Sequence, residues 1–177
     1  MPHIHTEPGQ HDHTVSIYLI RTDFNEPKIM LHFHRKVKKW AQFGGHIELH
    51  ETPWLSLVHE LKEEAGYDIH HLKILQPTRR LKAIKGAVVH PQPVVHATMG
   101  YPSNKGHFHT DTTYALVADT DPESSPQEGE SNKLRLFNRD QLVGSEEIDS
   151  ITRDTALHIL DEILPHWQPI QTSEFAS

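Results

Sequence analysis

Glu60, Glu63 and Glu64 are the residues whose types and spacing most clearly point to chemistry. Residues three and four positions apart are neighbours on a helix, so a helix would gather these carboxylates on one face. Carboxylates this close repel one another unless a cation lies among them. A hard divalent ion such as Mg²⁺ binds oxygen ligands and keeps waters and substrate phosphates in the rest of its shell. The spacing therefore predicts a metal-binding catalytic helix.

The neighbouring residues predict where this helix begins and ends. Thr52 can cap the first free amides, and Pro53 suits the first helical position because its missing N–H is not needed there. Gly66 can take the left-handed conformation that ends a helix, so the predicted helix runs to Ala65. The buried stripe expected from the periodicity consists of Trp54, Val58, Leu61 and Ala65.

The segment GHIELHETPWLSLVHELKEEAGY, residues 45–67, resembles the signature of the Nudix hydrolases, G-x5-E-x7-R-E-U-x-E-E-x-G-U, where U is bulky and apolar. Six of the seven fixed positions match: Gly45, Glu51, Glu60, Glu63, Glu64 and Gly66. The resemblance implies an α/β (α+β) fold, the Nudix α/β/α sandwich with a mixed central sheet. It also implies cleavage of a nucleoside diphosphate linked to another moiety, X, by an attacking water with Mg²⁺ or Mn²⁺.

The resemblance also implies roles for individual residues. Glu60, Glu63 and Glu64 would be metal ligands and catalytic groups, and the carbonyl of Gly44 or Gly45 would complete the inner shell. Glu51 would contact the ligand residues without binding the ion directly. The bound ion would neutralise phosphate charge, orient the diphosphate and lower the pKa of a bound water.

His59 occupies the position where the signature has arginine. Arginine is a fixed charged fork, whereas histidine offers at most two donors and is often uncharged near neutral pH. At a spacing of four residues His59 can reach Glu63, and neighbouring glutamates can hold it protonated. Two interpretations follow: an active enzyme with histidine in the arginine's place, or a weakened scaffold that binds a nucleotide without cleaving it.

Two further stretches supply candidate substrate-binding residues. Four cations crowd residues 35–39, and Arg35, Lys38 and Lys39 could clamp phosphates, although a solvated loop explains the run equally well. Trp40 could stack on a base or close the core beneath the loop, and we favour the core.

Alternation over His107–Asp119 predicts a strand that directs His107, His109 and Asp111 to one side. Such a set could bind zinc or non-haem iron, but some Nudix relatives carry a similar strand in the substrate pocket. We therefore interpret His109 and Asp111 as pocket or structural groups. The alternating His3, His5, His11 and His13 are interpreted as a solvated terminus rather than a metal site.

The acidic segment 119–133 predicts a mobile surface loop. In parts of the Nudix family a glutamate from such a loop reaches the metals. The candidates for a catalytic base outside the helix are therefore Glu123, Glu128 and Glu130.

The remaining elements predict one domain over residues 14–167, with a loose arm at 1–13 and a frayed tail at 168–177. Strands are expected at Val15–Ile20, Lys28–His34, Ile69–Leu75 and Leu134–Phe137, with an amphipathic helix over Thr152–Leu164 that Pro165 ends. Gly100–Gly106 is a turn by composition.

Composition narrows the function classes. The chain of 177 residues contains no cysteine, which removes disulfides and thiolate zinc sites and is compatible with a cytoplasmic location. A formal charge of −7 disfavours a dedicated nucleic-acid binder. No apolar run suggests a membrane span, and the first residues lack a signal-peptide core. A homodimer is compatible with the sequence.

The prediction is a divalent-metal-dependent pyrophosphohydrolase acting on a small nucleotide-like substrate. Oxidised nucleoside triphosphates, ADP-ribose-like dinucleotides and nucleotide sugars all fit, because specificity lies in loops outside the signature. The alternative is an inactive nucleotide-sensing module. An isoprenoid-diphosphate isomerase shares the fold but normally needs an active-site cysteine, so it ranks below both.

Overall fold

A computed structural model describes residue 7 and residues 9–100 and 107–175. Within these residues, strands of both directions form one mixed sheet with the central order β3-β2-β1-β7-β5-β9. Three further strands join it, because β4 pairs with β1, β6 with β7 and β8 with β2. The strands are β1 (His11–Arg21), β2 (Lys28–His34), β3 (Lys39–Ala41), β4 (Phe43–His46), β5 (Lys73–Gln76), β6 (Val95–Gly100), β7 (Phe108–Ala118), β8 (Leu134–Phe137) and β9 (Gln168–Gln171).

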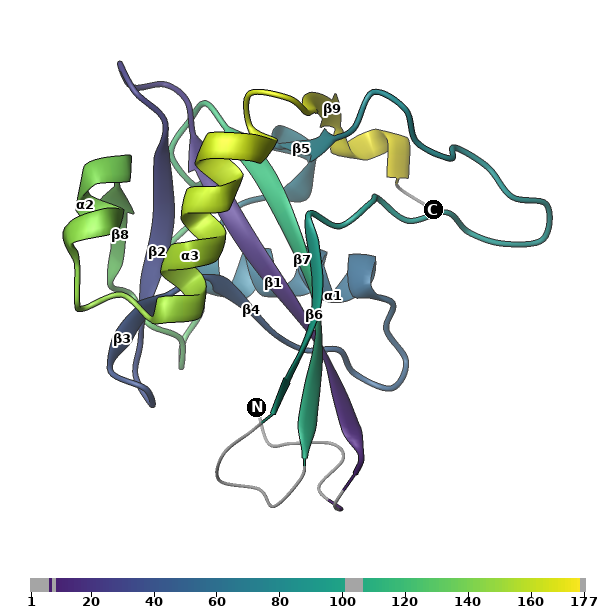
Figure 1. Cartoon of the computed structure of the whole chain (residues 1–177), viewed down its shortest axis with the longest axis horizontal. Helices are drawn as coiled ribbons and strands as arrows, with labels where there is room; N and C mark the ends of the chain where they lie inside the picture. The colour runs from purple at the N-terminus through teal and green to yellow at the C-terminus, as the bar shows by residue number, and fades with distance from the viewer. Residues whose placement is uncertain (1–6, 8, 101–106, 176–177) are drawn as a thin grey trace.

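The long parallel pair of β1 and β7 forms the centre of the sheet (Figure 1). The pairing runs without interruption from His11 opposite Phe108 to Arg21 opposite Ala118. A parallel pair of this length has side chains packed on both faces, which explains the nearly continuous apolar run at Val15–Ile20.

Helices lie on the two faces of the sheet (Figure 1). On one face is α1 (Pro53–Glu60), which continues as a π-helical turn at Leu61–Ala65. On the other face is α3 (Ser150–His158), which continues as a π-helical turn at Ile159–Ile163 and follows the short α2 (Arg139–Gly144). Short 3-10 turns occur at Ile69–His71 and Thr172–Phe175.

Alternation along β1 divides its side chains between two cores. Val15 and Ile17 belong to the core that contains Leu57 of α1. Tyr18 and Ile20 belong to the core that contains residues of α3. The α/β/α sandwich with a mixed sheet is therefore confirmed. None of the helices in the described residues is long and apolar enough to cross a membrane.

Several element predictions hold, and three need correction: the strand over Ile69–Leu75, the loose N-terminal arm and the frayed tail. Lys28–His34 and Leu134–Phe137 are strands with the expected bounds. The expected strand over Ile69–Leu75 is instead a 3-10 turn followed by β5, because Asp68 caps the turn through the amide of His70. The expected loose arm contains the start of β1, which already pairs with β7 at His11. Of the expected Gly100–Gly106 turn, residues 101–106 lie outside the described residues, as do His3 and His5.

The tail was expected to fray, but Gln168–Gln171 pairs antiparallel with β5 as strand β9. Thr172 then donates a hydrogen bond from its hydroxyl to the carbonyl of Ile69 at 2.6 Å. These contacts are between residues about a hundred positions apart, and local composition gives no sign of them.

Candidate active site

The helix that carries Glu60, Glu63 and Glu64 is present with its expected ends. Thr52 caps it by accepting a hydrogen bond from the amide of Leu55 at 3.3 Å, and Pro53 is the first helical residue. Gly66 ends it with a φ of 72°, in the left-handed region. A Cβ at Gly66 would collide with the carbonyl of Ser124, so both conformation and space require glycine there.

The last turn of this helix differs from the expectation, because Leu61–Ala65 is π-helical. A π-turn widens the helix locally, and such turns occur frequently at functional sites. Glu63 and Glu64 lie in this turn, whereas Glu60 is the last residue of the regular α-helix.

Two of the three carboxylates are buried. Only 4% of Glu60 and 7% of Glu64 is exposed. Burial raises the pKa of Glu60 to about 7 and the pKa of Glu64 to about 9. The carboxyl of Glu64 accepts a hydrogen bond from the amide of Gly44 at 2.8 Å, which only partly offsets the cost of burial.

These carboxylates fit a divalent cation. Glu60 Oε1 is buried and has no hydrogen-bond partner among the described residues. A buried acceptor of this kind is costly unless a cation or a donor faces it. A divalent ion would keep both carboxylates ionised at neutral pH.

His32 is a neighbour of Glu64 that the sequence did not indicate. Its Nδ1 lies 3.6 Å from Glu64 Oε1, and burial lowers the pKa of His32 to about 4. The ring is therefore neutral near pH 7, and it packs edge-to-face on Phe43. The pairing of β2 with β3 and β8, rather than a local motif, places His32 here.

His59 contacts two glutamates of the signature. Its Nε2 lies 3.0 Å from Glu63 Oε1, and its Nδ1 lies 3.3 Å from Glu51 Oε1. Partial burial lowers the pKa of His59, but the charges of Glu63, Glu51 and Glu60 outweigh it and raise the pKa above its ordinary value. Glu51 also accepts a hydrogen bond from the amide of Glu48, so it fastens the preceding turn to the helix.

Gly44 and Gly45 lie in β4, opposite Ser16 and Val15 of β1. Gly44 has a φ of 131°, and a Cβ there would collide with the carbonyl of Val15. Glycine therefore lets β4 approach β1 closely while the Gly44 amide faces Glu64.

The basic residues of the segment 35–39 contact different parts of the chain. Arg35 donates to the carbonyls of Gly129 and Glu130, and Lys39 donates to the carbonyl of Glu146 at 2.7 Å. Lys38 is an exposed turn residue with a φ of 54°. Trp40 packs edge-to-face on Phe33 and Phe137, with ring centroids 5.6 and 5.5 Å away. Its ring is thus part of the core, as we favoured.

His107, His109 and Asp111 were expected to project to one side as a group, but Asp111 makes different contacts from the two histidines. Asp111 is buried and accepts hydrogen bonds from the hydroxyls of Thr14, Ser16 and Thr113 at 2.7, 2.9 and 2.7 Å. It therefore joins β1 to β7. The two histidines instead gather near Asp12 and His46, which the sequence did not indicate.

The loop over residues 119–133 packs against the end of the catalytic helix. The amide of Gln127 donates to the carbonyl of Glu63 at 2.8 Å, and the amide of Ser124 donates to the carbonyl of Gly66. Glu123 accepts a hydrogen bond from the amide of Asp68 through one carboxylate oxygen and is hydrogen-bonded to His71 Nδ1 through the other. The charge of Glu130, by contrast, acts on both Glu60 and Glu64 and contributes to their raised pKa values.

The sequence profile of the NUDIX domain matches residues 11–158, most of the chain. The chain belongs to the Nudix family. A search of curated proteins found no match.

Solved structures agree with this assignment. A NUDIX-family hydrolase from Clostridium perfringens has 27% identity and a TM-score of 0.67, over 85% of this chain and 96% of that one. The MutT NUDIX hydrolase from Burkholderia pseudomallei has 16% identity and a TM-score of 0.57, over 84% and 97%. The C. elegans Ap4A hydrolase has 14% identity and a TM-score of 0.53, over 83% and 89%. The last two likenesses show the shared Nudix fold.

Proposed function

We propose that this Nudix protein is a divalent-metal-dependent hydrolase that cleaves the diphosphate linkage of a nucleoside diphosphate joined to another moiety, by attack of water at phosphorus. The observation that carries the proposal is the buried pair of Glu60 and Glu64, with raised pKa values and a buried Glu60 oxygen that has no donor among the described residues. Membership of the Nudix family supports the same reaction class.

Glu60, Glu63 and Glu64 would hold Mg²⁺ or Mn²⁺, with a carbonyl of Gly44 or Gly45. The ion would supply charge neutralisation at the diphosphate and a more acidic water. The amide of Gly44 orients Glu64, and His59 orients Glu63 and Glu51 together. Burial of Glu60 and Glu64 excludes water from the side of these carboxylates that faces the core.

Glu130 is the loop residue that we propose as the general base. Its charge acts on Glu60 and Glu64, and Arg35 holds its backbone carbonyl. Glu123 is engaged by His71 and the amide of Asp68, at the far end of the π-turn. Glu130→Gln should therefore lower kcat with little change in KM, whereas Glu123→Gln should leave kcat close to that of the native protein.

The test of the function is product release from a panel of nucleotide substrates with Mg²⁺ or Mn²⁺ present. The panel should contain an oxidised nucleoside triphosphate, ADP-ribose, a nucleotide sugar and a dinucleoside polyphosphate. Glu60→Gln or Glu64→Gln should remove most turnover while circular dichroism shows a folded protein. Glu162→Gln, an exposed glutamate near the end of the α3 segment, is the matched control.

The alternative is a module that binds a nucleotide without cleaving it, and the replacement of arginine by His59 is the observation in its favour. Calorimetry on the same panel separates the two. If every substrate binds without product release, and the binding is unchanged in Glu60→Gln, the protein is a nucleotide sensor and not a hydrolase.

A further inference from the structure

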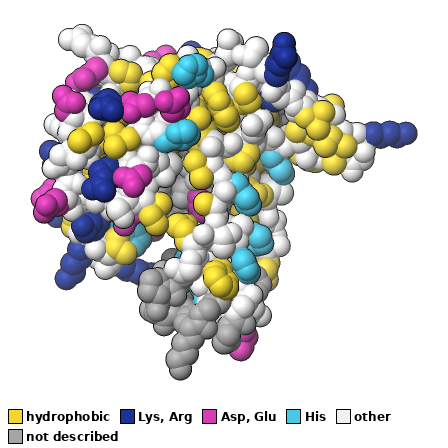
Figure 2. Space-filling view, in the orientation of Figure 1, with side chains coloured by type: hydrophobic (Ala, Val, Ile, Leu, Met, Phe, Trp, Pro, Cys, Tyr) yellow, Lys and Arg dark blue, Asp and Glu magenta, His cyan; other side chains and the backbone are white. Residues whose placement is uncertain are grey.

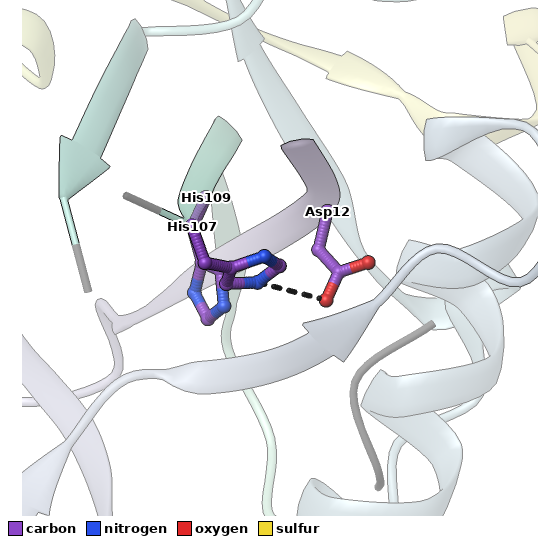
Figure 3. A group of neighbouring side chains, drawn as sticks. All are labelled: Asp12, His107 and His109. Atoms are coloured by element: carbon purple, nitrogen blue, oxygen red, sulfur yellow. Dashed lines mark ion pairs between the residues drawn. The ribbon is translucent and has the colours of Figure 1, made fainter. Parts of the chain in front are cut away.

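A second cluster of metal-binding side chains lies where β7 begins, apart from the catalytic helix. Asp12, His107 and His109 each place a ligand atom within 4.8 Å of the others (Figure 3). Asp12 and His107 are buried, with 1% and 0% exposed, and His109 is half-buried. Histidines and carboxylates are seldom buried together without a structural or functional reason.

The sheet register brings these residues together. Asp12 of β1 is the Cα partner of His109 of β7, and His46 of β4 is the partner of Thr14. Alternation along β1 places Asp12 on the same side as Ser16 and Tyr18. Tyr18 packs in the core under α3, so the cluster is on the other side of the sheet from the packing surface of α1.

The distance between Asp12 and His107 fits two ligands of a tetrahedral ion, and His46 lies on the same carboxylate oxygen. His107 Nε2 lies 3.2 Å from Asp12 Oδ2, and His46 Nε2 lies 3.4 Å from the same oxygen. Neighbouring ligand atoms in a tetrahedral zinc site are about 3.4 Å apart, given Zn–N distances of about 2.0–2.1 Å. Hydrogen bonds between a charged ring and a carboxylate are shorter, at about 2.7–2.9 Å.

The ring of His109 is steeply inclined to the rings of its two histidine neighbours. His109 meets His46 edge-to-face at 5.1 Å and meets His107 edge-to-face at 5.4 Å, measured between ring centroids. The rings of His107 and His109 and the carboxylate of Asp12 can therefore face a single small ion, with the ring of His46 next to them.

We propose that Asp12, His107 and His109 bind one divalent transition-metal ion of the zinc class, with His46 beside Asp12 Oδ2. Imidazole nitrogens suit zinc, copper, iron and nickel, whereas Mg²⁺ prefers oxygen ligands such as the glutamates of the catalytic helix. The two sites thus differ in the ions they select. The proposal does not depend on the hydrolase activity.

The bound ion would hold β1 to the start of β7. Asp12 lies in β1, His109 lies in β7, and His107 directly precedes β7. Three protein ligands would leave one position of a tetrahedral shell to water. Because His46 of β4 contacts Asp12, and β4 also carries Gly44, whose amide holds Glu64, the ion would support the turn that leads into α1.

Cobalt is the probe for the test, because tetrahedral Co²⁺ has visible absorption bands and takes the same ligands as Zn²⁺. The full chain is stripped with a chelator and titrated with Co²⁺ in excess Mg²⁺, which occupies oxygen-rich sites. We expect one equivalent of tetrahedral Co²⁺ in the native protein, displaced by Zn²⁺ but not by Mg²⁺. Zn²⁺ should also raise Tm.

Variants assign the site to its residues. Asp12→Asn, His107→Asn and His109→Asn should each weaken Zn²⁺ binding by about 100-fold or more, since even groups behind the ligands contribute about 10–100-fold. His109 is half-buried, so its variant decides the matter if the replacement of buried His107 prevents folding. Circular dichroism monitors the fold of each variant.

Control variants address the other histidines, because the chain contains 17 and Figure 2 shows several on one face. His96→Asn changes an exposed histidine of β6, and a combined His3→Asn and His5→Asn variant changes the N-terminal pair. All controls should bind Zn²⁺ as the native protein does. Absence of a tetrahedral Co²⁺ spectrum, or unchanged binding in folded His109→Asn, would overturn the proposal.

Discussion

His59 shows how one side chain can take the place of another with a different shape. The signature has an arginine at this position, and the histidine ring here reaches two glutamates at once, one through each nitrogen. Glu63 lies on the next turn of the helix, whereas Glu51 precedes the helix. The ring therefore fixes the turn before α1 relative to its end.

We expect His59→Gln to lower kcat about tenfold with little change in KM, the usual loss when a group that orients a ligand is removed. Glutamine has one donor group and cannot reach both carboxylates. His59→Arg should retain most of the native rate, because arginine can donate to both. Steady-state kinetics with Mg²⁺ measures this, and equal rates for all three proteins would show that the contact has no catalytic role.

Trp40 packs against the core of the protein. Its ring packs between Phe33 and Phe137. Trp40→Ala should reduce the free energy of unfolding by about 2–4 kcal/mol, somewhat below a fully buried tryptophan because Trp40 is half-buried. Trp40→Phe should lose less, and neither variant should raise KM. Urea denaturation and kinetics check both statements, and a KM increase in Trp40→Phe would favour base stacking.

At the level of elements, local signals in the sequence were sufficient to predict the helix that carries Glu60, Glu63 and Glu64. Thr52, Pro53 and Gly66 act within a few residues of themselves, so both ends could be predicted. The π-turn could not be, because periodicity does not separate it from a regular turn. Asp12 and His46 were missed for a different reason. They meet the histidines of β7 only through strand pairing between distant residues.

Glu123, in the loop over residues 119–133, contacts His71 in the 3-10 turn that follows the helix. We expect this contact to depend on pH. The hydrogen bond and charge of Glu123 raise the pKa of His71 above its ordinary 6.5. Desolvation raises the pKa of Glu123, but the amide of Asp68 and the ring of His71 outweigh it, so the pKa falls below its ordinary 4.5.

The contact between His71 and Glu123 should therefore be strongest between pH 4.5 and pH 6.5, the ordinary pKa values of the two groups. The contribution of His71 is complete below 6.5 and is lost as pH rises through its raised pKa. The contribution of Glu123 is complete above 4.5 and is lost as pH falls through its lowered pKa. We expect amide exchange in the loop, corrected for its intrinsic pH dependence, to be slowest in this window. The effect should be small, because both groups are exposed.

The comparison variant for this experiment is His70→Asn, which changes the neighbouring exposed histidine. It should keep the pH dependence of exchange, whereas His71→Asn should remove it. A loop that exchanges in the same way in both variants would show that the backbone contacts of Ser124 and Gln127 hold it alone.

For the molecule as a whole, the parallel pair of β1 and β7 is the centre to which β4 and the Asp111 network attach. β1 pairs with β4, which supplies Gly44 beside Glu64, and β7 carries Asp111. Asp111 receives three hydroxyl hydrogen bonds, two of them from β1. Ser16 in turn accepts from Gln42, whose side-chain oxygen accepts from Thr152 of α3. One buried carboxylate thus joins two central strands and, through them, a helix.

Asp111→Ala should consequently destabilise the whole domain rather than one part of it. Three buried hydroxyls would lose a charged acceptor, and hydrogen bonds to charged groups contribute about 1.5–3 kcal/mol each without adding fully. We expect a loss of about 3–5 kcal/mol in urea denaturation, as for other broken buried networks. Asp111→Asn keeps the shape and one acceptor oxygen, so it should lose less. Thr112→Val, on the opposite side of β7, is the control. A loss as large in Thr112→Val would mean that strand packing, and not the carboxylate network, holds β1 to β7.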